Sequence, residues 1–466
     1  MLRLIKSVFH VVTLKMDCKL YFVMLVKMIP GILHLNSKIK YGITSRNSFM
    51  YLFKPLDSAL QEYIVGCSST KKTNVLALIN PETKDKKLPR GNLVKIIGDC
   101  GNILAEQEAL LYQYSQPGWK KFDKTKVVLP AENEHRFVAG YAFNVDPQGC
   151  RDIDDAILIG IDGFIYIAIA DVACWLVKNP DIFEKASKIG QTLYSNGQVQ
   201  APLLPIQDEC SLFPDKTRKA VALKFKWNGA ISDISFEKIE FVNTESFTYE
   251  NISQDNKKLL KEISSFLANK PLSCSHEWIS ELMIFYNSEA AKILIQKKEG
   301  LLRIQSSPEK SEYKDFVDIS FLENKAAEYA YANIPQKHWA LNKEYCHATS
   351  PIRRFADIVN QMVLRKDPEL SYSIAELNKQ STNAKKFERE SFFMCQILGS
   401  EKRETAGIVL NNHRIWIPEW KRMITCKNEN KLGERGVVKY SLSMDRLTWK
   451  KRMVFRFECE DTGCPE

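Results

Sequence analysis

Short apolar runs separated by turn residues dominate the chain between about residues 40 and 115. Asn74–Ile79 (NVLALI) and Gly91–Asn102 (GNLVKIIGDCGN) carry β-branched residues between Gly, Pro and Asn, which predicts short strands. Several such strands in a row suit a small barrel, and barrels of the OB type bind single strands with a basic groove and aromatic side chains. Tyr51, Phe53 and Tyr63 could stack on bases in such a barrel, but we expect them to pack in its core.

From about residue 137 the pattern changes to long apolar runs and helical periodicity. Gly163–Ala173 (GFIYIAIADVA) is almost continuously apolar, which predicts a strand buried on both faces. Apolar residues recur at helical spacing in Glu277–Leu294, so we expect a helix there that packs against the core. Ile352–Leu364, with Pro351 in its first turn, and Asn383–Glu401 predict two further helices. After these helices the C-terminal stretch returns to strand patterns.

The N-terminal segment, residues 1–30, mixes apolar residues with basic ones. A membrane helix needs roughly 20 consecutive apolar residues. Every window of that length is interrupted by a cation: Arg3, Lys6, Lys15, Lys19 or Lys27. We therefore expect no membrane span. The first acidic residue is Asp17, which leaves a mitochondrial transit peptide open. An over-extended start is the alternative, with the true first residue at Met16, Met24 or Met28.

Composition favours a globular protein with an anionic partner. Hydrophobic residues make up 45% of the 466 residues, and Lys plus Arg exceed Asp plus Glu to give a formal net charge of +10. Phosphates attract such a basic balance, although the same balance also serves solubility. The length suits roughly two to four domains. Twelve scattered cysteines without paired CxxC motifs signal no zinc finger and predict free thiols in a reducing compartment.

The most informative segment is Asn144–Gly160 (NVDPQGCRDIDDAILIG). Four aspartates fall within ten residues: Asp146, Asp152, Asp154 and Asp155. Carboxylates this close repel one another unless a cation lies among them, and Mg²⁺ prefers carboxylate oxygens while it keeps water or substrate phosphates as other ligands. Two such ions can activate a water and stabilise the leaving oxygen of a phosphodiester. The alternatives are a solvated acidic loop, which the apolar flanks disfavour, and a structural calcium site, although the segment fails the EF-hand template.

The same segment resembles the RNB domain of ribonuclease II, ribonuclease R and the exosome's Dis3-type exonucleases. The family pattern reads DP, four residues, then DxDDA, and Asp146-Pro147 is followed at that spacing by the other three aspartates and Ala156. Further segments resemble the family in its order: IAIADVACWLV, TLYSNGQVQAPLLPIQDECSLFPDKTRKAVAL, ISELMIFYNSEAA, YCHATSPIRRFADIVNQ and FERES. These matches span roughly residues 137–401, and PRGNLVKIIGDCGNILAEQEALL is similar to the family's cold-shock barrels.

The resemblance implies roles for the cluster and for one arginine. Asp146 and Asp155 would bind Mg²⁺, with Mn²⁺ as the alternative ion. Asp154 matches the aspartate that is most essential to cleavage in the family, and Asp152 completes a set of four candidate metal ligands. Arg353, in SPIRR, would clamp the scissile phosphate, because a planar guanidinium satisfies two phosphate oxygens and stabilises developing charge. The candidate catalytic residues are thus Asp152, Asp154 and Arg353.

The resemblance also implies contacts to the RNA end. Tyr194 would stack on the 3′-terminal base, a contact worth about 1–3 kcal/mol per base that tolerates any sequence. Glu388, in FERES, would contact the RNA near its 3′ end, although a solvated helix residue is the plain alternative. His347, inside the second signature, is expected to be a structural histidine. Tyr249 resembles another family tyrosine, but only weakly.

The chain departs from the family pattern in the middle and at the C-terminus. The stretch between Ser211 and Thr349 is short, and the strand that carries the second aromatic of the family's base clamp is trimmed near residues 266–276. We expect an α/β (α+β) RNB catalytic domain flanked by small all-β OB-like barrels. The expected division is an uncertain N-terminal extension at 1–39, a cold-shock or OB-like RNA-binding domain at 40–118, the RNB domain at 131–402 and an abbreviated OB-like domain at 403–466.

The expected activity follows from the resemblance and the cluster together. It is a Mg²⁺-dependent exoribonuclease that hydrolyses single-stranded RNA from its 3′ end to nucleoside 5′-monophosphates, in RNA degradation or processing. Selectivity for RNA would come from the 2′-OH. The alternatives are an RNB-fold protein that binds RNA without cutting it, which the intact cluster disfavours, and a DNA exonuclease. We expect a cytoplasmic monomer without membrane contact; the mitochondrion is the alternative if the basic N-terminus is a transit peptide.

Overall fold

The computed structural model describes most of the chain. It describes residues 9–16, 19–26, 28–82, 88–115, 118–119, 122–214, 216–310, 312–316, 318–368, 371–399, 401–442 and 453–459, with backbone alone for 9–26. The transit-peptide and alternative-start interpretations concern the N-terminal segment, of which residues 1–8, 17–18 and 27 lie outside those described. Within the described ranges, no helix has both the length and the apolar character needed to cross a membrane.

The chain divides into two compact units. One contains residues 1–115, 195–198 and 385–466, and the other contains residues 116–194 and 199–384. The division cuts through the long helix α9 (Ile374–Gly399), which begins in one unit and ends in the other. The predicted domain limits at 40–118, 131–402 and 403–466 stay predictions.

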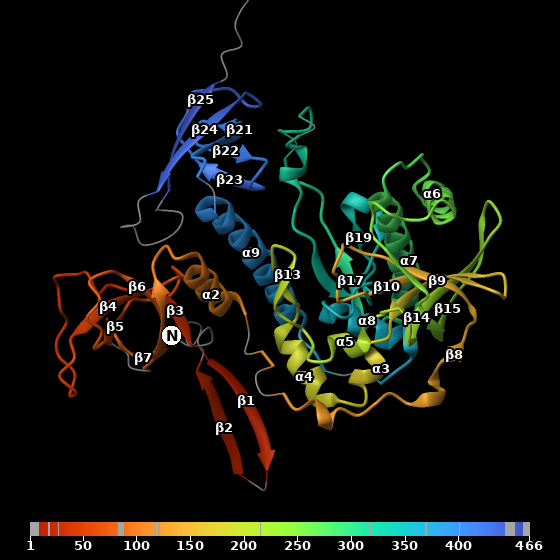
Figure 1. The fold of residues 1–466 in the computed structure, drawn as a ribbon, viewed down its shortest axis with the longest axis horizontal. Helices are drawn as coiled ribbons and strands as arrows, with labels where there is room; N and C mark the ends of the chain where they lie inside the picture. The colour runs from red at the N-terminus through yellow and green to blue at the C-terminus, as the bar shows by residue number, and fades with distance from the viewer. Residues whose placement is uncertain are drawn as a thin grey trace, which may run out of the picture. The chain divides into compact units, whose positions relative to one another are not determined.

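The second unit is built on a seven-stranded sheet in the order β16-β9-β10-β11-β14-β15-β8. Its five central strands pair antiparallel: β9 (Gly140–Val145), β10 (Asp155–Gly160), β11 (Ile165–Ala170), β14 (Thr217–Trp227) and β15 (Ile231–Val242). The short strands β16 (Glu245–Phe247) and β8 (Arg136–Phe137) add to the two edges in parallel. The strands and the neighbouring helices can be followed in Figure 1.

Both faces of the central strand β11 are buried. All six residues of β11 are buried; Tyr166 and Ala168 belong to one core cluster, while Ile167 and Ile169 belong to a second. This alternation follows from the two-residue period of a strand. It confirms the prediction that the apolar run is buried on both sides, although the strands are antiparallel and not parallel.

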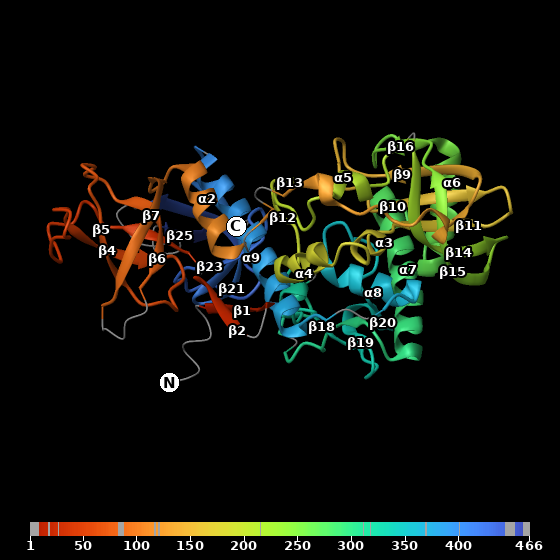
Figure 2. The same ribbon diagram turned by 90° about the horizontal axis from the view of Figure 1, so that it is seen from below.

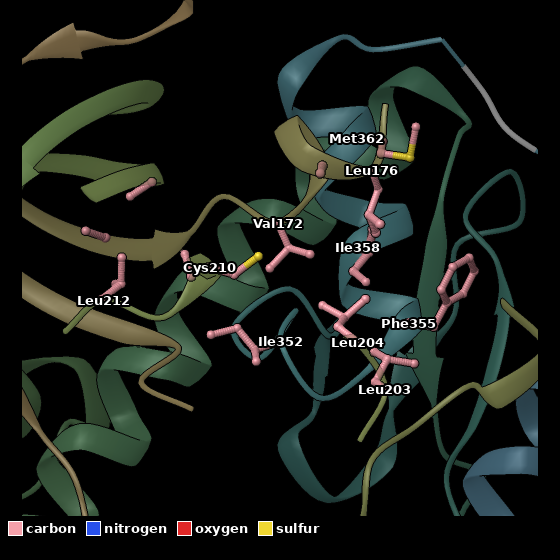
Figure 3. Packing of buried hydrophobic residues seen from close by; sticks show 14 of the residues in the cluster. Val172, Leu176, Leu203, Leu204, Cys210, Leu212, Ile352, Phe355, Ile358 and Met362 are labelled. Atoms are coloured by element: carbon pink, nitrogen blue, oxygen red, sulfur yellow. The ribbon is translucent and has the colours of Figure 1, made fainter. Parts of the chain in front are cut away.

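Helices supply the partners of the two faces. The first core cluster contains side chains from α3 (Ala173–Leu176), α4 (Pro180–Ile189), α5 (Gln207–Cys210) and α8 (Phe355–Arg365). Figure 3 shows part of it, with Phe355, Ile358 and Met362 along α8. The second cluster contains side chains from α6 (Gln254–Ala268) and α7 (Ser275–Lys297). Figure 2 gives a second view of α3, α7 and α8 beside the strands.

Short elements complete this unit. Two of them are two-stranded sheets, β17 (Leu301–Ile304) with β18 (Glu328–Tyr331) and β19 (Lys337–His338) with β20 (Lys343–Glu344). A third pair, β12 (Leu193–Ser195) with β13 (Gln198–Ala201), includes residues assigned to the first unit. The described residues also form four 3₁₀ turns. The turns are η1 (Lys124–Lys126), η2 (Glu132–Glu134), η3 (Ser320–Glu323) and η4 (Trp339–Leu341).

Two predicted helix limits are wrong. α8 begins at Phe355 and not at Ile352, because Arg354 is extended and bridges to Gln191, which holds the preceding residues in a separate turn. Pro351 therefore lies in that turn. α9 begins at Ile374, nine residues before the predicted start at Asn383. Its polar first turns hide the periodicity, although Leu377 packs in the core.

The first unit contains a closed barrel and an open sheet. The barrel order is β3-β4-β5-β7-β6, with strands β3 (Ile29–Leu33), β4 (Met50–Pro55), β5 (Tyr63–Gly66), β6 (Val75–Pro81) and β7 (Arg90–Asp99), followed by α2 (Ile103–Tyr114). Tyr51, Phe53 and Tyr63 are 7%, 0% and 3% exposed, which confirms them as core residues and excludes them as base-stacking platforms. β1 (Phe9–Met16) and β2 (Lys19–Val26) form a separate hairpin.

The C-terminal sheet has the order β23-β22-β21-β24-β25. Its strands are β21 (Glu404–Asn411), β22 (Arg414–Ile417), β23 (Arg422–Thr425), β24 (Arg435–Leu442) and β25 (Met453–Cys459). Phe393 and Ile397 of α9 belong to its core. The return to strand structure after the helices is therefore confirmed.

A buried ion network ties the start of the second unit to α8. The Arg365 side chain is 1% exposed and bonds three carboxylates, with Glu134 Oε2 at 2.8 Å, Asp367 Oδ2 at 2.6 Å and Asp171 Oδ2 as the third. His135 Nε2 lies 2.7 Å from the same Asp171 oxygen. Arg365 thus neutralises a carboxylate that has no access to water.

We predict that Arg365→Met destabilises the protein by about 3–5 kcal/mol, because removal of one partner leaves the buried Asp171 carboxylate without its cation. Urea unfolding followed by circular dichroism measures the change. The matched control is Lys188→Met, which removes an exposed helical pair with Glu184 and should change stability by less than about 0.5 kcal/mol. Equal effects of the two substitutions would contradict the prediction.

Candidate active site

The four aspartates lie in one loop of the seven-stranded sheet. Asp146 directly follows β9, and Asp155 is the first residue of β10. Because these two strands pair antiparallel, the loop that joins them begins and ends at the same end of the sheet. A turn at Pro147–Cys150, with Gly149 at φ 78°, reverses the chain inside the loop, as glycine permits. The predicted cluster is therefore a structural cluster.

Negative charge in this cluster is poorly compensated. Burial raises the pKa of Asp154 to about 7, with Arg353 working in the opposite direction. Burial and the charges of Asp146 and Asp154 raise the pKa of Asp155 well above its ordinary value. The pKa of Asp146 is also raised, by burial and by Asp152. Buried carboxylates that gain too little from their neighbours provide a place for a cation.

Asp154 and Arg353 form the central contact. Asp154 is 3% exposed. Its Oδ1 accepts a hydrogen bond from the Ile352 backbone N–H at 2.9 Å, and its Oδ2 accepts one from Arg353 Nε at 3.2 Å. The Asp154 backbone oxygen accepts from Ala170 N at the end of β11, so the sheet holds the residue in place. The structure thus brings together two candidates 199 positions apart in the chain.

The turn that carries Arg353 is held from several sides. Ser350 N donates to Asp357 Oδ1 at 2.7 Å, and Thr192 N donates to the Arg353 oxygen at 3.0 Å. Ile352 is fully buried in the first core cluster, together with Leu203, Leu204 and Leu212, as Figure 3 shows. Apolar packing therefore fixes the turn while the Arg353 side chain stays 45% exposed.

Tyr194 contacts the cluster through its hydroxyl group. It lies in β12, is half-buried, and its Oη donates to Asp152 Oδ2. Burial and the Asp152 charge raise its pKa above the ordinary value. Cys150 Sγ lies 3.6 Å from the other Asp152 oxygen. The sequence indicated neither contact, although Cys150 stands only two residues before Asp152 in the motif.

Tyr249, which resembles a family tyrosine only weakly, is a neighbour of the cluster. Its ring stacks on His276 with centroids 3.7 Å apart and an angle of 19° between the planes. Burial, then Asp155 and Asp146, raise its pKa to about 12. His276 lies in the first turn of α7, in the region where the sequence left the second clamp aromatic without a position. Only the weak resemblance at Tyr249 could have indicated this pair.

Two other predicted residues have surroundings of their own. His347 Nδ1 is 2.9 Å from Tyr329 Oη, and its ring meets Tyr329 and Tyr345 edge-on, as suits the structural role expected of it. Glu388 is exposed on α9 and belongs to the other unit. Its contact with the RNA end stays a prediction.

Among the described residues, the metal-ligating atoms that converge within 4.8 Å of one another are those of His135, Asp171 and Cys174, and no three of the four aspartates converge as closely. Arg365 Nη1 bonds Asp171 and lies 3.4 Å from His135 Nε2. A guanidinium already supplies the positive charge that a metal ion would bring. Of the two groups, the aspartate cluster is therefore the candidate metal site.

Family models match both units. The RNB domain model matches residues 135–265 and 242–367, and the Dis3-like cold-shock domain 2 model matches residues 51–115. Mycoplasma genitalium ribonuclease R is 27% identical over 281 residues, which cover 56% of this chain and 38% of the relative. Human exosome complex exonuclease RRP44 is 22% identical over 447 residues, which cover 72% of this chain and 47% of that protein. The chain spans less than half the length of these relatives.

Solved structures show the same fold. Mycoplasma genitalium RNase R in complex with ribose-methylated single-stranded RNA superposes with a TM-score of 0.73 at 16% identity, over 97% of this chain and 94% of that one. Yeast Ssd1, described as a pseudonuclease, gives 0.65 at 16% identity, over 93% and 70%. Because the RNB match extends over half of the sequence and coincides with the unit that carries the aspartate cluster, the chain belongs to the RNB-domain family, with ribonuclease R and the Dis3 exoribonucleases as relatives.

Proposed function

We propose that this chain is a divalent-cation-dependent 3′-to-5′ exoribonuclease that hydrolyses single-stranded RNA to nucleoside 5′-monophosphates. The observation that carries the proposal is that three buried carboxylates, Asp146, Asp154 and Asp155, share the charge of one partly exposed guanidinium, Arg353. Cations that offset such carboxylates also bind phosphates. The relatives named ribonuclease R and the RNase R structure with single-stranded RNA support RNA as the substrate class.

The donor set fits Mg²⁺, with Mn²⁺ as the alternative. Asp146 and Asp155 offer hard oxygen ligands, which Mg²⁺ prefers over nitrogen or sulfur. Burial, and after it the neighbouring carboxylates, raises the pKa of both groups, and a bound cation would relieve both effects. When bound, the ion would supply an activated water at neutral pH and would stabilise charge on the leaving oxygen.

The protein's own groups have separate tasks in this proposal. Arg353 binds the scissile phosphate, and its planar fork stabilises charge that develops on the phosphate oxygens. The Tyr194 ring stacks on the terminal base, while its hydroxyl orients Asp152. Tyr249 and His276 form a second aromatic surface near Asp155 and Asp146. Glu388 contacts the RNA near its 3′ end.

The rival function is RNA binding without cleavage. Yeast Ssd1, a pseudonuclease with a similar fold, supports this rival. The intact aspartates and the Asp154–Arg353 contact favour the enzyme. We further propose a monomer in the cytoplasm. Cysteines that form no disulfide in the described part of the chain, such as Cys67, Cys174, Cys210 and Cys346, suit a reducing compartment.

We predict that the wild-type protein shortens a 5′-labelled single-stranded RNA to a small limit product in Mg²⁺, and that Asp155→Asn slows this by at least about 100-fold. Loss of a metal ligand forfeits several kcal/mol of charge stabilisation. Gel analysis of single-turnover reactions measures the rates, with EDTA as a control. A deoxyribose oligonucleotide of the same sequence should stay intact.

The possible outcomes separate the candidate functions. Intact RNA that stays bound to the wild-type protein would contradict the enzyme and leave a binding protein. Equal cleavage of the two sugars would point to a less selective nuclease. Immediate release of the 5′ label as a mononucleotide, without labelled intermediates, would contradict the direction of attack.

We predict that Tyr194→Phe separates the two tasks of Tyr194. The phenyl ring keeps base stacking, so RNA affinity in Ca²⁺ should stay within about twofold of wild type. Loss of the hydroxyl donor to Asp152 should raise the Mg²⁺ concentration for half-maximal cleavage about tenfold, because second-shell partners typically contribute 10–100-fold to metal affinity.

Tyr194→Leu is the matched control, because it lacks both ring and hydroxyl. It should weaken RNA binding by about 1–3 kcal/mol as well, as measured by fluorescence anisotropy. If Phe and Leu weakened RNA binding equally, stacking by Tyr194 would be wrong. If Phe left the Mg²⁺ dependence unchanged, the hydroxyl would have no role in orienting Asp152.

A further inference from the structure

The Asp154 carboxylate differs from its neighbours in how the protein uses its oxygens. Both oxygens accept hydrogen bonds from the second signature, one from Ile352 N–H at 2.9 Å and one from Arg353 Nε at 3.2 Å. By contrast, Asp146 has one oxygen bonded to Asn144 Nδ2 at 2.9 Å. For the Asp155 carboxylate, the described residues offer no hydrogen-bond donor. Asp154 is also 3% exposed, which leaves little access for an ion and its waters.

The guanidinium beside Asp154 works against metal binding at the same oxygen. An ion on Oδ2 would lie next to the positive charge of Arg353, and like charges at that range repel strongly in a partly buried site. Charge-assisted hydrogen bonds to a guanidinium are in turn strong and directional. The contact therefore holds Arg353 in place, while the carboxylates of Asp146, Asp152 and Asp155 have no hydrogen bond to a cation within the described residues.

The orientation of Arg353 is defined at two points. Nε donates to Asp154, and Nη2 donates to Ser350 Oγ at 3.0 Å. Since the guanidinium is planar, two fixed nitrogens fix the direction of the third. Asp154 is itself anchored through its backbone oxygen to Ala170 N at 2.8 Å. The sheet thus sets the position of the arginine through this one carboxylate.

From these contacts we infer that Asp154 is a positioning residue that acts through Arg353 and not a metal ligand, while Asp146 and Asp155 hold the ion. The inference rests on the proposed nuclease function and narrows the ligand set that the sequence suggested. It predicts that loss of this carboxylate abolishes cleavage while the protein still binds the metal ion. Asp152, bonded to Tyr194 Oη, remains available to either task.

The first test measures metal binding without RNA. Mn²⁺ is titrated into the full-length chain and free Mn²⁺ is followed by electron paramagnetic resonance, for wild type, Asp154→Asn and Asp155→Asn. In Asp154→Asn the side-chain oxygen can still accept from Ile352 N–H, but the amide nitrogen meets Arg353 Nε as a second donor. We expect Mn²⁺ affinity within about threefold of wild type for Asp154→Asn and a loss above about tenfold for Asp155→Asn.

The second test is a double-mutant cycle on single-turnover cleavage. Asp154→Asn alone should slow cleavage by about 100-fold or more, as removal of a transition-state stabiliser does. In an Arg353→Ala background the same change should cost less than about threefold, because residues that act as a unit are not additive. Asp155→Asn should keep most of its effect in that background, since its task does not depend on the arginine.

Two results would overturn the inference. One is a loss of Mn²⁺ affinity in Asp154→Asn as large as in Asp155→Asn, and the other is an undiminished Asp154→Asn effect in the Arg353→Ala background. Thermal unfolding checks that each variant folds, and Asp154→Ser is measured in the same way if Asp154→Asn does not. A wild-type protein that binds Mn²⁺ but leaves RNA intact would contradict the nuclease proposal alone, because the metal titration still decides the role of Asp154.

Discussion

Mutual repulsion of carboxylates is the constraint on which the active unit depends. The four aspartates lie where β9 ends and β10 begins, beside the buried strand β11. Burial there raises the free energy of a charged carboxylate. The fold compensates the negative charge of these carboxylates in different ways. Asp154 accepts hydrogen bonds from Arg353 and from a backbone N–H. Asp152 accepts one from a tyrosine hydroxyl, and Asp146 accepts one from an asparagine amide. The charge that remains is what a divalent cation and a phosphate can share.

Much of the architecture follows from local sequence signals. The unbroken apolar run predicted β11, because a strand between two helical layers needs no polar face. The periodicity of α7 was equally plain, since its stripe repeats over many turns. The start of α8 could not be read in this way. Arg354 has a normal helical sequence context, but its extended backbone depends on a bridge to Gln191, 163 residues away, and no local pattern encodes that partner.

In the candidate site, too, local sequence signals indicated the residues but not the contacts between them. The aspartates could be predicted because they are close in sequence and carry a recognisable spacing, and Arg353 because its signature is long. Their contacts could not, since hydrogen bonds such as Tyr194 to Asp152 are set by how β12 meets the loop. The stack of Tyr249 on His276 is harder still. It joins two residues of unremarkable context that only the packed chain brings together.

Charge balance is also the reason why we assign the proposed function to one acidic cluster of this unit and not to the other. Around Arg365 the fold supplies a cation and a histidine, and although burial opposes charge, His135 and Arg365 lower the pKa of Asp171 overall. That network is complete, and removing a member can only destabilise it. Around Arg353 the net shift has the opposite sign. Burial and the neighbouring carboxylates raise the pKa of Asp155 by more than the arginine lowers it. A site whose electrostatics are incomplete in the free protein gains most from binding a cation together with an anionic substrate, and this imbalance is the physical basis for assigning catalysis to the β9–β10 loop.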